Sequence, residues 1–446
     1  MAPVTDFSVK DDYKYLEGFG SYHSSEAIPG ATPQVNNTPQ RPPFGLRTER
    51  ISGSSFTAPR DYNLQTWMYR TSSSLDHEEF VLYDDASTPK APSILTPNSY
   101  MWPAIPTSDG TDWISQRLLA RNGDPAANTG LAIWIFSMTE SMKPKTVFSS
   151  LDGDSLIIPH AGALDIQTEL GKLLVRQNEI CVIPRGIRYR VNLPSGPCRG
   201  YICELFQGHF RLPDLGVIGS TGLANVRDFQ IPTAHFDGSL ENGVAKANNA
   251  EYTIISRQAG RLWHCTQDHT PFDVAAWHGT FYPYKYDLAR FCVLGNVLFD
   301  EHDPSLYTVL TAPSHREPGT AVVDFAIIPA RWQVAEDTFW PPYYHRNTMS
   351  EFYGPIINAQ DQSHPFNQGE GFKPFVAGLN GPMTTHGATE EDFEKASKAK
   401  LDPAKTMTDG ITLFLLETEM PLYLSDWAAE AAVTNFKAKS KRPSKI

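Results

Sequence analysis

Short segments with alternating hydrophobic and polar positions dominate the chain, and aromatic and β-branched residues fill many of their apolar positions. Glycine, proline and asparagine bound these segments, so each of them predicts a β-strand. The clearest group lies between residues 151 and 210 and comprises Ser155–Pro159, Leu164–Thr168, Leu173–Val175, Glu179–Ile183 and Tyr189–Asn192. Strands this short, recurring about every eight to twelve residues, predict a β-sandwich or a barrel.

Further segments of the same kind predict strands on both sides of this group. They are Phe80–Tyr83, Leu131–Phe136, Thr146–Phe148, Tyr252–Ser256, Val293–Phe299, Tyr307–Thr311, Ala321–Pro329 and Thr412–Glu417. The order of strand, glycine turn and Ile183-Pro184-Arg185-Gly186 resembles a cupin jelly roll. A helix is expected at Thr389–Ala396, which has a capping threonine and an acidic first turn. We predict a mainly β protein with a jelly-roll or cupin-like β-sandwich architecture and few helices.

The length of 446 residues favours more than one domain. We predict an N-terminal β-sandwich domain over residues 1–290 and a second domain over residues 291–446. The first sixty residues are rich in proline, glycine, serine and asparagine, but they also carry Tyr13, Tyr15, Phe19 and Tyr22. Disordered tails usually lack such aromatic residues. We therefore expect an ordered N-terminal arm that packs across the body or across a neighbouring subunit.

Charge and composition exclude several classes of protein. A net charge of −12 argues against a nucleic-acid-binding protein, and a small anionic substrate would need local cations or a metal to hold it. The chain has no apolar run of the roughly 18 residues that a membrane span requires, and its N-terminus has no apolar signal core. Five cysteines without a CxxC spacing predict a reduced, cytoplasmic protein without structural disulfides. The final Ser444-Lys445-Ile446 is close to a peroxisomal address, which makes peroxisomal targeting the alternative.

His345, Glu351 and His386 are the candidate metal ligands. Two imidazoles and one carboxylate form the facial triad of non-haem iron oxygenases, which leaves positions open for substrate and O2. His345 and Glu351 are separated by an even offset, so an extended segment would point both to the same side. His386 lies in the polar, glycine-flanked loop from Gly381 to Gly387. In a chain with 13 histidines this spacing alone is a weak signal.

The sequence predicts structural roles for the other histidines that could be considered as metal ligands. His160 and His209 stand alone, so we expect the cupin-like unit between residues 151 and 210 to be structural and not a second metal site. His264, His269 and His278 lie close together in the sequence, but their order matches no zinc template. We predict that these three lie in the core or at an interface.

The sequence around the candidate ligands resembles the homogentisate 1,2-dioxygenase family. Tyr344-His345-Arg346-Asn347, followed by Met349-Ser350-Glu351-Phe352, and the segment from Met383 to Gly387 are similar to the two iron-ligand motifs of that family. Collinear blocks extend almost from end to end, for example Gly18-Phe19-Gly20, Asp152-Gly153-Asp154, Leu212-Pro213-Asp214-Leu215-Gly216, Pro283-Tyr284-Lys285-Tyr286 and Phe393-Glu394-Lys395-Ala396-Ser397.

This resemblance implies a fold, a cofactor and a reaction. It implies a β-sandwich N-terminal domain, a cupin-like iron-binding C-terminal domain and a hexamer built as a dimer of trimers. His345, Glu351 and His386 would hold Fe(II), and Tyr344 and Asn347 would contact the ligands or the substrate. The family reaction is an extradiol-type cleavage in which O2 opens the ring of homogentisate to give maleylacetoacetate, a step of tyrosine and phenylalanine catabolism.

The candidate base departs from the family pattern. The catalytic histidine of the family lies in an Asp-His-x-Asp-Pro context, whereas this chain has Asp300-Glu301-His302-Asp303-Pro304. A shift of one residue in an extended segment points a side chain to the opposite face. Three interpretations stay open: Glu301 is the base, a local bulge brings His302 into its place, or neither residue acts.

Two predicted substrate contacts also differ from the family. Gln360 stands where the family has a tyrosine, and Asn380 stands where it has a histidine. Ligands that are kept while pocket residues change are typical of a site that retains its chemistry and alters its substrate. The leading hypothesis is cleavage of homogentisate; the alternatives are a paralogue that cleaves another hydroquinone or phenol, and a non-catalytic cupin that binds a metal or a phenol.

Overall fold

The computed structural model describes most of the chain. The described residues are 3–33, 40–83, 88–102, 105, 109–216, 219–291, 307–329, 331–333, 344–358, 376–387, 393–394, 397–398, 404–406 and 411–434. Strands dominate them, and among these residues α2 (Asp426–Ala431) is the one α-helix described over its whole length. Single 3-10 turns lie at Pro43–Gly45, Trp113–Ser115, Pro125–Ala127, Gly219–Gly222, Val226–Asp228 and Leu288–Arg290. The prediction of a mainly β fold with few helices is confirmed.

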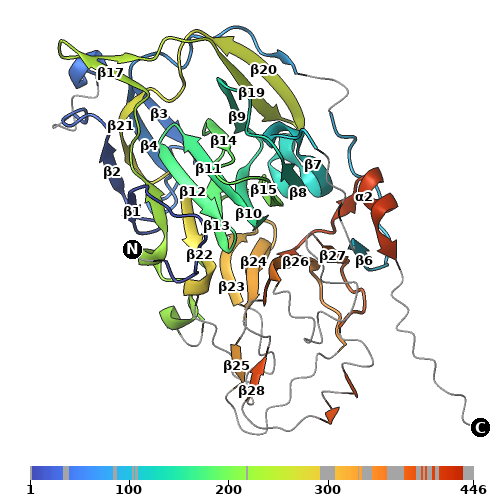
Figure 1. Cartoon of the computed structure of the whole chain (residues 1–446). Helices are drawn as coiled ribbons and strands as arrows, with labels where there is room; N and C mark the ends of the chain where they lie inside the picture. Colours follow the sequence, from blue (N-terminus) through green and yellow to red (C-terminus); the bar gives the residue numbers. More distant parts are fainter. Residues whose placement is uncertain are drawn as a thin grey trace, which may run out of the picture.

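Three sheets form the N-terminal part of the molecule (Figure 1). The largest runs, in spatial order, β1 (Tyr15–Glu17), β16 (Gln230–Pro232), β22 (Tyr284–Asp287), β13 (Glu179–Ile183), β10 (Asp154–Ala161), β15 (Cys198–Leu205), β8 (Thr129–Met138), β7 (Arg117–Asp124) and β30 (Tyr423–Leu424). The second runs β12 (Gly171–Arg176), β11 (Ala163–Thr168), β14 (Tyr189–Asn192), β9 (Thr146–Ser150), β19 (Tyr252–Gln258), β20 (Arg261–Gln267) and β5 (Val81–Leu82). The third runs β2 (His23–Glu26), β21 (Val274–Gly279), β4 (Gln65–Arg70) and β3 (Arg47–Ser52).

A fourth sheet is built mainly from the C-terminal part of the chain. Its order is β23 (Tyr307–Pro313), β24 (Ala321–Pro329), β29 (Ile411–Thr418), β26 (Ser350–Asn358), β27 (Ala377–Asn380), β6 (Tyr100–Trp102) and β31 (Val433–Thr434). Two separate hairpins pair β17 (Gly238–Glu241) with β18 (Val244–Ala247) and β25 (Arg331–Gln333) with β28 (Ala404–Thr406). The fold is therefore a cupin-like β-sandwich made of several layers.

The predicted strands agree closely with the observed ones. Tyr189–Asn192 and Ala321–Pro329 coincide with β14 and β24. Val293–Phe299 and the C-terminal Ser444–Ile446 lie outside the described residues, and so does most of the predicted helix at Thr389–Ala396. Cys181, Cys198, Cys203 and Cys265 are buried and free, whereas Cys292 also lies outside the described part of the chain. The domain boundary predicted at residue 290 borders on residues 292–306, which are not described, so it stays a prediction.

The N- and C-terminal parts share one hydrophobic core. The largest buried cluster contains Leu156 and Tyr201 from the N-terminal sheets together with Phe352 and Phe414 from the C-terminal sheet. A polar contact also joins the two parts: the Tyr201 hydroxyl donates a hydrogen bond to the carbonyl of Val376 at 2.7 Å. Two strands also cross over between the parts: β6 lies among the N-terminal strands in the chain but pairs in the C-terminal sheet, whereas β30 comes from the C-terminal part and pairs in the largest N-terminal sheet. This shared core fixes the sheet that carries the candidate site.

The N-terminal arm is ordered and packs against the body of its own chain. Asp287 accepts hydrogen bonds from the backbone N–H groups of Val4 and Thr5 at 2.9 and 3.1 Å. Further along the arm, Asp11 pairs with the buried Lys285 at 2.7 Å, and the hydroxyl of Tyr13 donates to Asp165 at 2.7 Å. Of the two packing modes expected for the arm, packing across the body is confirmed.

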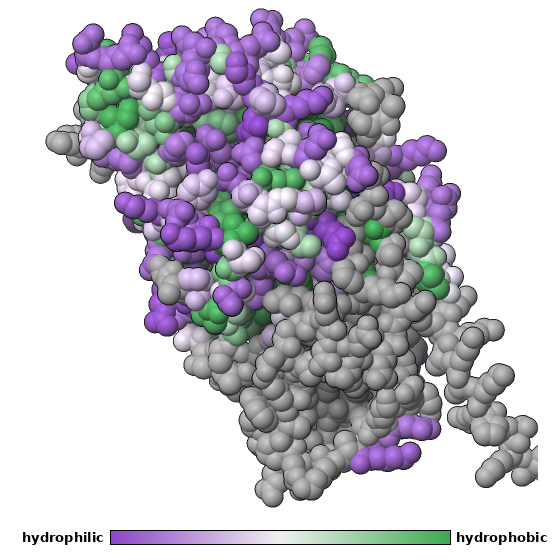
Figure 2. All heavy atoms as spheres, in the orientation of Figure 1, coloured by the Kyte–Doolittle hydropathy of each residue, from purple (hydrophilic) through white to green (hydrophobic). Residues whose placement is uncertain are grey.

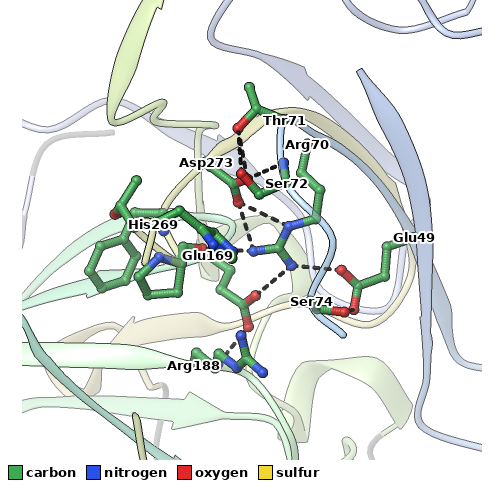
Figure 3. A network of polar contacts seen from close by, with 12 residues as sticks. Glu49, Arg70, Thr71, Ser72, Ser74, Glu169, Arg188, His269 and Asp273 are labelled. Carbon is green, nitrogen blue, oxygen red and sulfur yellow. Dashed lines mark hydrogen bonds and ion pairs between the residues drawn. The ribbon is translucent and has the colours of Figure 1, made fainter. Parts of the chain in front are cut away.

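Buried charges in the N-terminal part form networks and not isolated ions. Arg70 is almost fully buried and pairs with Asp273, Glu49 and Glu169 at 2.7, 2.6 and 3.1 Å, as Figure 3 shows. The remaining oxygen of Asp273 accepts from the backbone N–H of Ser72 at 2.8 Å. Such networks are stable because every desolvated charge has a partner.

The visible surface of the described residues is largely hydrophilic, with hydrophobic residues in small separate groups (Figure 2). No helix in the described part of the chain is both long enough and apolar enough to cross a membrane.

Candidate metal centre

His345, Glu351 and His386 converge on one point of the C-terminal sheet. One potential ligand atom of each residue lies within 4.8 Å of those of the other two. Nε2 of His386 lies 2.9 Å from Oε2 of Glu351, and Nε2 of His345 lies 3.6 Å from Oε1 of the same carboxylate. This is the only group of three such side chains found among the described residues. Two imidazoles and one carboxylate at these separations fit a divalent transition-metal ion such as Fe(II).

Two backbone hydrogen bonds hold the histidines side by side. The N–H of His345 donates to the carbonyl of His386 at 2.9 Å, and the reverse bond measures 3.2 Å. The two residues thus form an isolated antiparallel bridge, and their ring centroids are 4.2 Å apart. Residues directly opposite each other in an antiparallel bridge place their side chains on the same face. The bridge therefore aims both imidazoles at the same side.

The backbone between His345 and Glu351 is not the continuous extended segment on which the argument from their even offset depended. The chain bends at Thr348 and Met349, and β26 begins only at Ser350. Glu351 therefore takes its direction from the sheet, while His345 takes its direction from the bridge to His386. The convergence was predicted correctly, but the continuous extended segment used to argue for it was wrong.

A tight turn sets the direction of His386. The N–H of Thr384 donates to the carbonyl of Gly381 at 3.1 Å, and Met383 within this turn has a positive φ of 57°. The turn is anchored to the segment after His345, because the N–H of Met383 donates to the carbonyl of Asn347 at 2.7 Å. Positive φ is uncommon for a residue other than glycine and is found at sites that the surrounding structure holds firmly.

The protonation pattern around His386 fits a bound cation. Its Nδ1 lies 2.7 Å from the carbonyl of Thr384 and must donate there, so Nε2 of the neutral ring carries a lone pair. That Nε2 is buried and makes no hydrogen bond of acceptable geometry, although Oε2 of Glu351 is close. Two lone pairs that face each other at this distance require a positive charge between them, which a proton on Nε2 supplies in the protein alone and a metal ion would supply when bound.

The electrostatics of Glu351 lead to the same conclusion. Burial raises the pKa of its carboxyl, but His386, the amide of Asn347 and His345 lower it more, so the net pKa lies below the usual value. Burial lowers the pKa of His386, and the adjacent Glu351 raises it above its usual value. The site thus keeps Glu351 ionised, which a cation-binding carboxylate requires.

Comparison with known proteins places this site in a family. The profile of the homogentisate 1,2-dioxygenase N-terminal domain matches residues 14–288, and that of the C-terminal domain matches residues 289–441. The chain belongs to the homogentisate 1,2-dioxygenase family. It is 51% identical to the homogentisate 1,2-dioxygenase of Emericella nidulans over 95% of this chain and 93% of that one. The enzymes of Dictyostelium discoideum and Homo sapiens are 44% and 43% identical, each over 94% of this chain and 94% and 93% of theirs.

The sheet places further polar residues beside the triad of this homogentisate 1,2-dioxygenase family member. Glu351 lies directly opposite Asn380 on β27 and opposite Glu417 on β29. Such pairs share a face, so both side chains lie on the side of Glu351. Asn380 is buried, and its prediction as a substrate contact stays a prediction; the charge of Glu417 contributes to the raised pKa of His386. Sequence reasoning missed Glu417, because no local motif records which residue a distant strand will place opposite Glu351.

The structure describes only some of the other predicted site residues. Asn347 lies in the site and donates from Nδ2 to Oε1 of Glu351. Tyr344 is half exposed next to His345. Glu301, His302 and Gln360 lie outside the described residues, so the interpretations of the base and of this substrate contact stay predictions.

The remaining histidines have structural contacts. His160 is buried with Nδ1 facing the carbonyl of Pro355 at 2.8 Å, and His209 lies 2.8 Å from Asp154. His278 lies between the hydroxyls of Tyr22 and Tyr69, while His269 is buried and His264 packs edge-on against Tyr83. Among the described residues none of these five belongs to a metal-type cluster. Their prediction as structural residues agrees with these contacts.

Proposed function

We propose that this protein is an Fe(II)-dependent ring-cleaving dioxygenase that opens the ring of homogentisate with O2 to give maleylacetoacetate. The observation that carries the proposal is the identity of 51% to the Emericella nidulans enzyme over nearly the whole chain, combined with the convergence of its own His345, Glu351 and His386. We also propose that this reaction serves tyrosine and phenylalanine catabolism, an assignment that rests on the resemblance to the family.

His345, Glu351 and His386 would hold the iron. One carboxylate and two neutral imidazoles neutralise only part of the charge of Fe(II), so an ionised phenol is a favourable further ligand. Bound iron supplies the redox partner that lets O2 react with a closed-shell aromatic ring. The protein itself has to orient the ring, exclude competing ligands and remove the proton of the reacting hydroxyl.

We propose Glu301 or His302 as the base that removes this proton, with the third interpretation, that neither residue acts, decided by the same experiment. Either group accepts the proton from the hydroxyl oxygen and so raises the electron density of the ring before it is oxidised. We expect Glu301→Gln and His302→Ala to differ, with the base variant losing about 100- to 10,000-fold in kcat. Steady-state O2 consumption measures this. Small and equal losses in both variants would show that neither residue is the base.

The substrate is tested by direct assay. Protein reconstituted anaerobically with Fe(II) should consume O2 when homogentisate is added and form a ring-opened product that absorbs in the ultraviolet. Turnover of another hydroquinone without turnover of homogentisate would favour a paralogue. A paralogue is the second candidate because Gln360 and Asn380 differ from the residues of the family at these positions. Bound iron without O2 uptake on any phenol would leave only a binding function.

The triad is tested by metal retention. His345→Ala, Glu351→Ala and His386→Ala should each lower Fe(II) affinity by more than about 100-fold, since even residues that only support a ligand are worth about 10- to 100-fold. Equilibrium dialysis with metal analysis measures the loss. His264→Ala is the matched control and should retain iron. Retention of iron by all three triad variants would contradict the assignment of the ligands.

We also propose a hexamer arranged as a dimer of trimers, on the basis of the family assignment. Light scattering coupled to size-exclusion chromatography would give a mass about six times 49.7 kDa if this is correct. A monomeric or dimeric mass would contradict it.

A further inference from the structure

Asn347 connects the three segments that carry the triad. It follows His345 by two positions, its Nδ2 donates to Oε1 of Glu351, and its carbonyl accepts from the N–H of Met383 in the turn before His386. No other described residue is bonded to Glu351 and to the loop of His386 in this way. Asn347 is therefore in a position to control how the three ligands face one another.

The orientation of the Asn347 amide is determined by chemistry. A carboxylate oxygen only accepts hydrogen bonds, so the amide must present its NH2 group to Glu351; the flipped amide would place two acceptors against each other. The remaining Oδ1 is buried and has no hydrogen-bond partner among the described residues. Glu351 is thus the one described group to which this side chain is bonded, so the amide acts on the carboxylate and not on the packing around it.

The bond makes the two oxygens of Glu351 unequal. Oε1 accepts from the amide of Asn347 and lies 3.6 Å from Nε2 of His345, whereas Oε2 lies 2.9 Å from Nε2 of His386. Without the amide, Oε1 would lose this donor, and rotation about the last side-chain torsion, which is broad in glutamate, would let Oε1 bind a cation together with Oε2. A carboxylate that offers two oxygens to a cation would fill a position that substrate or O2 needs.

We propose that Asn347 is a positioning residue for Glu351: its amide occupies Oε1, so that Oε2 is the carboxylate oxygen left to bind a cation beside the two imidazoles, and it thereby keeps one side of the site open. The inference rests on the proposed function and assigns the amide a role distinct from substrate contact. It concerns only residues of this chain and the cation they would hold.

Cobalt(II) is a suitable probe because it binds nitrogen and oxygen ligands as Fe(II) does and its visible absorption depends on coordination number. The experiment compares the full-length protein with Asn347→Ala and with Asn347→Leu, which keeps the approximate volume but lacks the amide. Asn98→Ala is the matched control, since its amide bonds only locally, to Thr96 at 3.1 Å. Competition with a fluorescent chelator gives the Co(II) affinity, and the thermal midpoint of the metal-free protein reports on folding.

Both Asn347 variants should bind Co(II) about 10- to 100-fold more weakly, because the carboxylate is no longer held in place for the cation. They should also show weaker visible bands, because the second carboxylate oxygen raises the coordination number. Asn98→Ala should match the wild type. If the wild type binds Co(II) and both variants keep its affinity within about twofold and its spectrum, the inference is wrong and the proposed function stands. If the wild-type protein does not bind Co(II) or Fe(II), the proposed metal centre is wrong and this inference falls with it. If one of the two Asn347 variants does not fold, the result for the other variant decides the outcome, since alanine and leucine change the side-chain volume differently.

Discussion

Individual buried charges in this protein are stabilised by partners that come from distant parts of the chain. Arg70 on β4 is held by Asp273 and Glu169, and Arg257 on β19 pairs with Glu204 at 3.1 Å. The free energy of removing a charge from water is large, so a buried ion that loses its partner is strongly destabilising. These residues therefore report on the integrity of the N-terminal sandwich.

Arg70→Met should lower the free energy of unfolding by about 3–5 kcal/mol, because Asp273 and Glu169 would stay buried without their cation. Urea denaturation followed by tryptophan fluorescence measures the change. Arg50→Met is the matched control, since Arg50 is exposed and stacks over Trp67, and it should cost only about 1 kcal/mol. Equal effects of the two substitutions would show that the network around Arg70 does not stabilise the fold.

His160 should make stability depend on pH. Burial lowers its pKa from 6.5 to about 4, against the effect of the hydrogen bond to the carbonyl of Pro355. The unfolded chain takes up a proton below about pH 6.5, whereas the folded protein does so only near pH 4. The contribution of His160 to stability is therefore complete above pH 6.5 and is lost progressively as the pH falls toward 4.

The substitution His160→Asn keeps a donor for Pro355 and removes this titration. Between pH 7.5 and pH 5 the wild type should lose on the order of 1–2 kcal/mol more of its unfolding free energy than the variant does. Urea midpoints at the two pH values give the comparison. An identical loss in both proteins would mean that His160 titrates in the folded state as it does in the unfolded chain.

At the level of elements, charged contacts help to hold the N-terminal arm against the body. The side chain of Lys285 on β22 is almost fully buried, and it bonds to Asp11 of the arm and to Glu179 of β13 at 2.7 and 3.0 Å. Asp11 also accepts from the hydroxyl of Tyr15 at 2.7 Å. The arm therefore supplies one of the two carboxylates that make the burial of Lys285 tolerable.

Asp11→Ala should lower the free energy of unfolding by about 1.5–3 kcal/mol, the usual value for hydrogen bonds to a charged group. The adjacent Asp12→Ala is the control, because Asp12 is exposed and pairs only with the exposed Lys10. That substitution should cost less than about 1 kcal/mol. Thermal melts of both variants measure the difference, and a similar shift for both would contradict a stabilising role of the arm.

At the level of the whole molecule, the two halves of the chain depend on each other for complete sheets. β6 pairs with β27 and β31 in the C-terminal sheet, and β30 pairs with β7 in the largest N-terminal sheet. The indole of Trp102 on β6 also donates to the carbonyl of Ala428 in α2 at 2.7 Å. A cut between the halves would expose strand edges and apolar surface on both sides.

Fragments 1–290 and 291–446 should therefore not fold separately. The first lacks β30 and the second lacks β6, and exposed edges of this kind pair with other chains. Size-exclusion chromatography and near-ultraviolet circular dichroism should show aggregated or loosely packed fragments, with native signals when both are expressed together. Two fragments that are each monomeric and have a native near-ultraviolet spectrum would contradict this expectation.

The sequence by itself determined the position of most strands and which side chains are the candidate metal ligands. Hydrophobic alternation is a local property, so Tyr189–Asn192 and Ala321–Pro329 could be placed from their own residues. The motif context of His345, Glu351 and His386 predicted in the same local way a candidate ligand set, and the structure brings these three side chains together. The pattern of a strand does not record its partner, however, and the register between distant strands is set by the fold as a whole.

Only the tertiary structure decided how these pieces meet. It placed Glu417 opposite Glu351, joined His345 to His386 through a backbone bridge, and directed the amide of Asn347 at the carboxylate. These contacts join segments that are far apart in the chain or separated by a bend, and they form only when the shared core brings their sheet together. The sequence therefore specified which side chains carry the chemistry, and the packing of the sheets determined where each one points.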